Sequence, residues 1–199
     1  MPSETDCLND ALGQIGAARI TAIDDGSSNA NFCQTFYPAL RDGLIRSAHW
    51  NFAMTRVELA QDVTAPLFEF AYSYGLPSDL LKVVEYNGAN TDTTQLFIFG
   101  RQVVSRYRVE GRHLLTNDGT VKLVYLRRVT NPDEWDALFY QVVTTWLASK
   151  LAFAITKDER KSSALLTQAI NVLLPTALAV DGQENSVEPF RTDELLWGR

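Results

Sequence analysis

The side chains that could do chemistry in this chain are few, and the two histidines come first. His49 lies in the stretch AHWNFAMTR beside Trp50 and Asn51. A histidine in such surroundings can be the general base of an active site, or part of an aromatic face that binds sugar. His113 lies in a short run of strand-forming residues. Neither histidine belongs to a zinc-protease, nucleophile-elbow or phosphate-loop motif. We therefore expect both to be structural or surface residues, and the sequence indicates no catalytic residue.

The remaining candidate groups have simpler explanations. Glu134 and Asp136 resemble the carboxylate pair of a glycoside hydrolase, but the helix dipole also favours carboxylates in a first helical turn. Asp24-Asp25-Gly26 lacks the spaced ligands of a calcium loop and predicts a turn. Cys7 and Cys33 are too few for a disulfide framework and lack zinc-site spacing, so we expect buried, reduced thiols. No metal, no cofactor and no enzyme activity are expected.

Composition narrows the class of protein. Hydrophobic residues make up 46% of the 199 residues and charged residues 21%, which is typical of a soluble globular chain. No signal peptide and no uninterrupted apolar run near the roughly 18 residues of a membrane span is present, so no membrane association is expected. The net charge of −6, with no basic cluster larger than Arg127-Arg128, excludes a tight DNA-binding protein. It does not exclude a conduit through which DNA passes without sticking.

Apolar residues at helical spacing predict two helices before residue 67. The first covers 5–16 and ends on Gly16, and the second is capped by Ser27, Ser28 or Asn29. Pro38 falls inside the second helix and predicts a kink or a restart there. The apolar stripe of this helix consists of Cys33, Phe36, Tyr37, Leu40, Leu44, Ala48 and Phe52.

Between residues 67 and 129 the period of the sequence becomes that of strands. Short runs rich in β-branched and aromatic residues alternate with turn residues. The runs are 68–77, 80–86, 96–109, 112–116 and 121–129. Asn117-Asp118-Gly119 predicts that the last two runs pair as a hairpin. These features together predict an antiparallel meander.

Two further helices follow the strands. Asn131-Pro132-Asp133-Glu134 predicts the start of one, and Thr156-Lys157-Asp158-Glu159 the start of the next. Four helices with one apolar face each bury those faces most simply in a bundle. The predicted fold is therefore α+β: a bundle of about four helices (1–66 and 130–180), an inserted antiparallel β-meander domain (67–129) and an extended C-terminal tail (181–199).

The order of several short motifs resembles the head-to-tail adaptor family of short-tailed bacteriophages, which includes tail tubular protein A and the gatekeeper adaptors. The motifs run from ALGQIGA through YPALRDGLIRSAHWNFA and YGLPSDLLKVV to VYLRRVTNPDEWDALF and LASKLAFAIT, and the resemblance extends over residues 7–180. Besides the helix start at 133–139, its most specific residues are Tyr37, Pro38, Arg41, Asp42, Trp50, Asn51, Phe52, Leu76, Pro77 and Asp79.

The resemblance implies a virion protein of the neck or tail that is assembled in the host cytoplasm. Such proteins form a dodecameric ring below the portal, extend the DNA channel used in genome ejection, and offer a platform for the tail nozzle or tail-tube protein and for tail fibres. DNA would pass through the lumen without specific binding, and no cofactor is implied. Trp50 lies off the apolar stripe of the second helix, so we expect it to pack against the β insertion and to clamp the two parts together.

Three other functions remain open: a head-completion protein of a long-tailed phage, a virion-associated peptidoglycan hydrolase, and a cellular binding module. Mixed, charged helical faces bearing Arg41, Asp42 and Arg46 predict a wet interface, and hence a monomer or weak oligomer until the portal is present. The tail ends in apolar residues, and aromatic anchors of this kind dominate many interfaces. We expect it to dock on the portal or a neighbouring subunit, rather than on its own bundle, through Pro189, Phe190, Leu195, Leu196 and Trp197.

Overall fold

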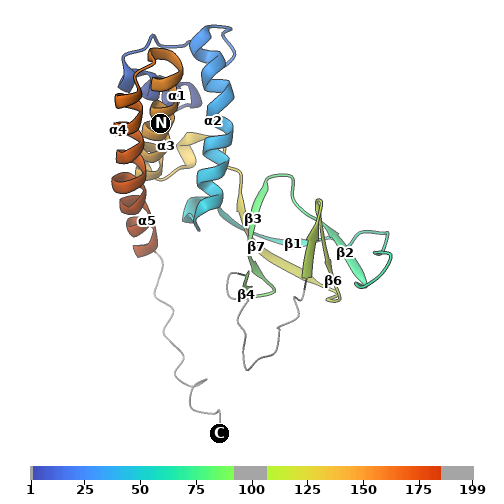
Figure 1. Cartoon of the computed structure of the whole chain (residues 1–199). Helices are drawn as coiled ribbons and strands as arrows, with labels where there is room; N and C mark the ends of the chain where they lie inside the picture. The colour runs from blue at the N-terminus through green and yellow to red at the C-terminus, as the bar shows by residue number, and fades with distance from the viewer. Residues whose placement is uncertain (1, 92–106, 185–199) are drawn as a thin grey trace.

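Helices at both ends of the described chain pack together, and the strands between them project to one side (Figure 1). The structure is a computed structural model and describes residues 2–91 and 107–184. Its class is α+β with antiparallel sheets, as predicted. The tail residues from Pro189 to Trp197, and most of the expected strand at 96–109, lie outside the described residues.

The first two helices begin where their capping residues stand. α1 (Glu4–Ile15) ends on Gly16, which adopts the left-handed conformation with φ 75° that glycine tolerates without strain. α2 (Ser28–Ser47) is capped by the Ser27 hydroxyl, which accepts a hydrogen bond from the Ala30 N–H. The helix runs through Pro38 and ends before Ala48, so of the predicted kink or restart the restart does not occur. Its apolar stripe is therefore shorter than the sequence period predicts.

The third helix starts later than predicted. Pro132–Glu134 forms only a 3-10 turn (η3), and α3 (Ala137–Leu151) begins after Asp136. The Asp136 carboxylate accepts hydrogen bonds from the N–H groups of Leu138 and Phe139, so it is the true cap. A π-helical segment, η4 (Ala152–Thr156), continues α3.

The last helix is long and continuous. α4 (Glu159–Gln168), the π-helical η5 (Ala169–Leu173) and α5 (Leu174–Gln183) follow one another without a break. We call this stretch, Glu159–Gln183, the outer helix. Its cap is Asp158 rather than Thr156, because the Asp158 carboxylate accepts from the Lys161 N–H. The helix also extends past residue 180, into the segment that was expected to be tail.

The described residues form seven strands in two antiparallel sheets, not one meander. The sheet orders are β1-β7-β3-β4 and β2-β6-β5. β1 lies before residue 67, so the β part begins directly after α2 and its neighbouring turn, earlier than expected. The strands are β1 (Met54–Leu59), β2 (Tyr72–Gly75), β3 (Leu80–Tyr86), β4 (Ala89–Asn90), β5 (Tyr107–Glu110), β6 (His113–Thr116) and β7 (Val121–Arg127).

The turn Asn117-Asp118-Gly119 connects the two sheets and closes no hairpin. β6 pairs with β2 and β5, whereas β7 pairs with β1 and β3. The Tyr74 hydroxyl donates to the Asp118 carbonyl at 3.0 Å, and the Tyr86 hydroxyl donates to the Asp118 carboxylate at 2.7 Å. These bonds hold the turn against both sheets. Because β6 and β7 belong to different sheets, the prediction that they pair as a hairpin is wrong.

Two hydrophobic clusters share the central strands. Val84 and Leu126 face the helical cluster, while Tyr86 and Leu123 belong to a smaller cluster between the sheets. Leu123 and Leu126 lie on opposite faces of β7 by the alternation of side chains, and the register shift between Val83 and Glu85 lets Val84 and Tyr86 of β3 face different clusters. Both strands thus join the β part to the bundle. Cys7 and Cys33 are free, buried thiols of the helical cluster, as predicted. Burial raises the pKa of both, that of Cys33 to about 11.

Two helical stretches of the described chain are long and apolar enough to cross a membrane by length and composition, although neither is one uninterrupted apolar run. In Ala137–Thr156, 56% of the apolar window is buried, as in the core helix of a soluble protein. In the outer helix, Glu159–Gln183, only 11% is buried. No charged residue stands between Lys161 and Asp181. The expectation of mixed, charged outer faces is therefore wrong for this helix.

Candidate functional site at the junction of the bundle and the β part

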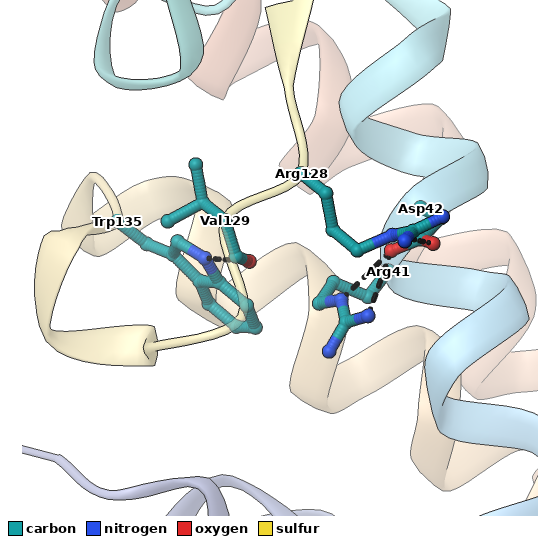
Figure 2. Close-up of polar contacts among 5 residues, drawn as sticks. All are labelled: Arg41, Asp42, Arg128, Val129 and Trp135. Carbon is teal, nitrogen blue, oxygen red and sulfur yellow. Dashed lines mark hydrogen bonds and ion pairs between the residues drawn. The ribbon is translucent and has the colours of Figure 1, made fainter. Parts of the chain in front are cut away.

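An ion-pair network joins α2 to the chain that leaves the β part (Figure 2). The Asp42 carboxylate accepts hydrogen bonds from the Arg41 Nε at 2.9 Å and from the Arg128 Nε at 2.6 Å. Arg41 is only 6% exposed, and its guanidinium lies 5.4 Å from the centre of the Tyr37 ring. The prediction that Arg41 is exposed is wrong, because Asp42 neutralises its charge and Tyr37 covers it.

Arg128 also holds the turn that leads into β3. Its backbone N–H donates to the Asp79 carbonyl at 2.7 Å, and the Asp79 carboxylate accepts from the Tyr125 hydroxyl at 3.2 Å. Burial, and then the charge of Asp79, raise the pKa of Tyr125. Leu76 and Pro77 lie in the same connection between β2 and β3, where the Pro77 carbonyl accepts from the Leu80 N–H at 3.2 Å. They shape the turn that presents Asp79.

Two tryptophans complete the junction from the side of the bundle. The Trp50 indole N–H donates to the Leu44 carbonyl at 2.9 Å, and the Trp135 indole N–H donates to the Val129 carbonyl at 3.1 Å. Both rings meet Phe139 edge-on, at centroid distances of 4.9 and 5.3 Å. Trp50 therefore packs in the helical core and not against the β insertion. Because it lies beyond the end of α2, the period of that helix does not set its direction.

The turn that follows Trp50 holds the end of the outer helix. The Asn51 N–H donates to the Asp181 carboxylate at 3.1 Å, and its side-chain amide donates to the Asp181 carbonyl at 2.8 Å. Asp181 is 8% exposed, and burial raises its pKa. Phe52 continues the aromatic cluster, with its ring 4.8 Å from that of Phe139. The junction thus fixes the last turn of α5 as well as the β part.

His49 lies at this junction as a structural neighbour. The Lys82 Nζ is 3.2 Å from the His49 Nε2, and the Arg46 guanidinium donates to the Leu81 carbonyl. Both contacts join the end of α2 to β3. They are consistent with the expected structural role of this histidine.

His113 lies elsewhere, beside Asp62 and Ser73, which are the residue types of a hydrolase triad. In a triad the carboxylate and the serine contact opposite nitrogens of the imidazole. Here the Asp62 carboxylate accepts from the Ser73 hydroxyl at 2.6 Å and lies 2.9 Å from the His113 Nδ1. Ser73 approaches that same nitrogen at 3.5 Å, so its proton is directed to Asp62 and not to the base. The bonds from Ser73 and then His113 lower the pKa of Asp62 and hold the loop at 60–71.

Most residues that carry the resemblance meet at the junction, although they are spread along the chain. Pro38 is exposed on α2, and Leu76 and Pro77 lie in the neighbouring turn. Sequence reasoning missed Arg128, Trp135 and Asp181 as members of this site. Two features of the sequence could have pointed to them. One is the double arginine at 127–128, and the other is Asp181, the first charged residue after the uncharged run 162–180. The members brought together are Tyr37, Arg41, Asp42, Trp50, Asn51, Phe52 and Asp79.

No protein-family model matches this chain, and no curated protein matches it in sequence. Across residues 2–91 and 107–184, no group of three or more His, Cys, Asp and Glu side chains could hold a metal ion. The charged and amide groups of the junction bond one another, while the buried Tyr37 hydroxyl has no hydrogen-bond partner among the described residues. What this arrangement does physically is to fix the β part and the end of α5 relative to the bundle.

Proposed function

We propose that this chain is a structural virion protein, a head-to-tail adaptor that forms a ring between the portal and the tail nozzle of a short-tailed phage. In this proposal the ring extends the DNA channel and carries tail components. The chain is a part of the virion neck and catalyses no reaction. Its partners are the portal, the nozzle or tail-tube protein, possible tail fibres, and further copies of itself.

The junction is the observation that carries this proposal. The residues of the resemblance come from α2, from the turn after it and from the turn before β3. They are brought together by Asp42, Arg128 and the Asn51–Asp181 bonds. An adaptor with one partner above and another below must hold its two contact regions at a fixed separation and angle. A junction of partly buried ion pairs and hydrogen bonds provides that constraint, because opening it would leave Arg41 and Asp181 without their partners.

The charge of the chain is compatible with the same role. The net charge of −6 disfavours adhesion to the phosphate backbone, which suits a lumen through which DNA must slide. The outer helix supports an assembly role more generally. A helix without charges on its exposed face is normally covered by another structure.

Electron microscopy of the purified chain mixed with the portal protein of the same genome tests the proposal. We expect a ring of this chain on the tail-facing side of the portal. A chain that leaves the portal unoccupied at about 10 µM, a concentration at which micromolar affinities would be seen, would contradict the adaptor function. Zymography on peptidoglycan with the same preparation tests the hydrolase alternative directly.

A further inference from the structure

The bundle has an apolar groove between α2, α3 and α5. Its volume is about 380 Å³, and Phe36, Leu44, Trp146 and Leu174 are among the residues that line it. Of the described residues that line it, Lys150 is the one that carries a charge. A groove of this composition on the surface of a helical bundle suits an apolar ridge from another helix.

Gly43 lies in the wall of this groove, in the interior of α2. Glycine inside a helix costs roughly 0.5–1 kcal/mol relative to alanine. A Cβ at this position would meet no atom within 4 Å, so packing within the described chain does not require the glycine. Because Gly43 has no side chain, the groove stays open, and another molecule can approach the backbone of α2 closely.

The outer helix is the complementary feature. Between Lys161 and Asp181 it has no charge. Its inward side buries Ala169, Ala177 and Asp181, and Leu165, Leu173 and Leu174 are partly buried against the helical cluster. Five other large apolar residues of the helix have 36 to 56% of their surface exposed. They are Leu166, Ile170, Val172, Leu178 and Val180.

We propose that the groove beside Gly43 receives the exposed face of the outer helix from a second copy of this chain. The proposal deepens the ring proposed above and rests on that function. The exposed ridge residues are not among those that line the groove, so a ridge docked in a groove joins two different surface patches and can repeat from copy to copy until a ring closes. Each chain carries a net charge of −6, so two copies repel each other. A contact between the outer helix and the groove brings no like charges together.

The area available to one such contact is small for a stable pair. The outer helix has 25 residues, which makes it about 37 Å long and about 10 Å wide, so its face offers about 370 Å². A specific interface takes about 800 Å² from each partner. One contact is therefore marginal. In a closed ring each copy makes two such contacts, one through its helix and one through its groove, so that neither surface is left exposed, while each contact still takes about 370 Å² from each partner.

A lipid surface is the competing occupant for an apolar helix. Exposed Gln168 and Asn171 interrupt the apolar face, and such polar groups are costly in a hydrocarbon layer without partners. A protein groove whose lining includes hydroxyl groups, such as those of Thr35 and Ser47, accommodates them more readily. The second copy is therefore the favoured occupant.

The test uses a ridge variant and a groove variant of the full chain. Val172→Glu with Val180→Glu places charges on the exposed helix face, and Gly43→Leu fills the groove while favouring the helix. Sedimentation equilibrium from about 10 µM to about 1 mM measures self-association over the range where weak contacts appear. We expect each variant to associate at least about tenfold more weakly than the wild type. Thermal unfolding should show Gly43→Leu to be at least as stable.

A control and a mixing experiment make the outcome specific. Val63→Glu with Leu67→Glu adds the same charge to exposed residues of the β part and should associate as the wild type does. A mixture of the ridge and groove variants should form dimers but nothing larger, because one intact ridge and one intact groove remain. A wild type that stays monomeric, variants that associate normally, or a mixture that stays monomeric would each overturn the proposal. So would flotation of the wild type with phosphatidylcholine vesicles that the ridge variant abolishes.

These results are separable from the adaptor function. Self-association through this contact in a chain that ignores the portal would refute the adaptor function and leave the contact standing. Portal binding that survives in both variants together with unchanged self-association would refute the contact alone.

Discussion

Replacing Asp42 by alanine tests whether the junction depends on a buried charge. The Arg41 side chain is 7% exposed, so it would keep a desolvated charge after its counterion is removed. Removing one partner of a buried pair costs about 3–5 kcal/mol. Because Asp42 is 23% exposed, water solvates part of the site, and we expect Asp42→Ala to lower the free energy of unfolding by about 2–4 kcal/mol. Arg128→Ala should cost about 0–1 kcal/mol, since that side chain is 43% exposed.

Urea denaturation followed by tryptophan fluorescence and circular dichroism measures both free energies. For a chain of this size 1 kcal/mol corresponds to about 2–4 °C in Tm, so Asp42→Ala should melt about 8 °C lower. Arg127→Ala is the matched control, because its pair with Glu134 is partly exposed and should contribute about 1 kcal/mol or less. If Asp42→Ala and Arg128→Ala cost the same within about 0.5 kcal/mol, burial of Arg41 does not explain the junction, and the reasoning fails.

Three further changes test other parts of the structure. The Cys7→Ala, Cys33→Ala double variant should lose at most about 2–4 kcal/mol as a small core deletion; stoichiometric zinc or an internal disulfide by mass spectrometry would contradict inert thiols. Asp181 has a folded pKa above its unfolded value of about 3.9, so the folded chain binds the extra proton and stability should fall as pH rises from about 4 through the folded pKa. Asp181→Asn keeps an acceptor for Asn51 and should lack this slope in denaturation between about pH 4 and 7; a slope like that of the wild type would refute the assignment. Deleting residues 186–199 should leave Tm nearly unchanged and abolish stable attachment to the portal; normal attachment in a pull-down, or failure to fold, would contradict docking through Phe190 and Leu195-Leu196-Trp197.

The sequence by itself determined the features that depend on neighbours along the chain. Ser27 and Gly16 bound their helices because capping involves backbone groups only a few residues away. Leu80–Tyr86 is a strand because its composition and period favour one over that short span. The α+β class follows from such local patterns, since each element must bury its apolar face somewhere.

Tertiary structure decided which elements meet. Asn117-Asp118-Gly119 signals a turn, but the strands on either side of it, β6 and β7, do not pair with each other. Each pairs with strands from other parts of the chain. Asp42 lies beside Arg41 in the sequence, but Arg128, far along the chain, bonds the same carboxylate, and no local pattern contains that information. The outer helix has the composition of a core helix, yet only 11% of its apolar window is buried. Burial is a property of what surrounds a segment in space, and the period of a sequence shows that an apolar face exists but not what covers it.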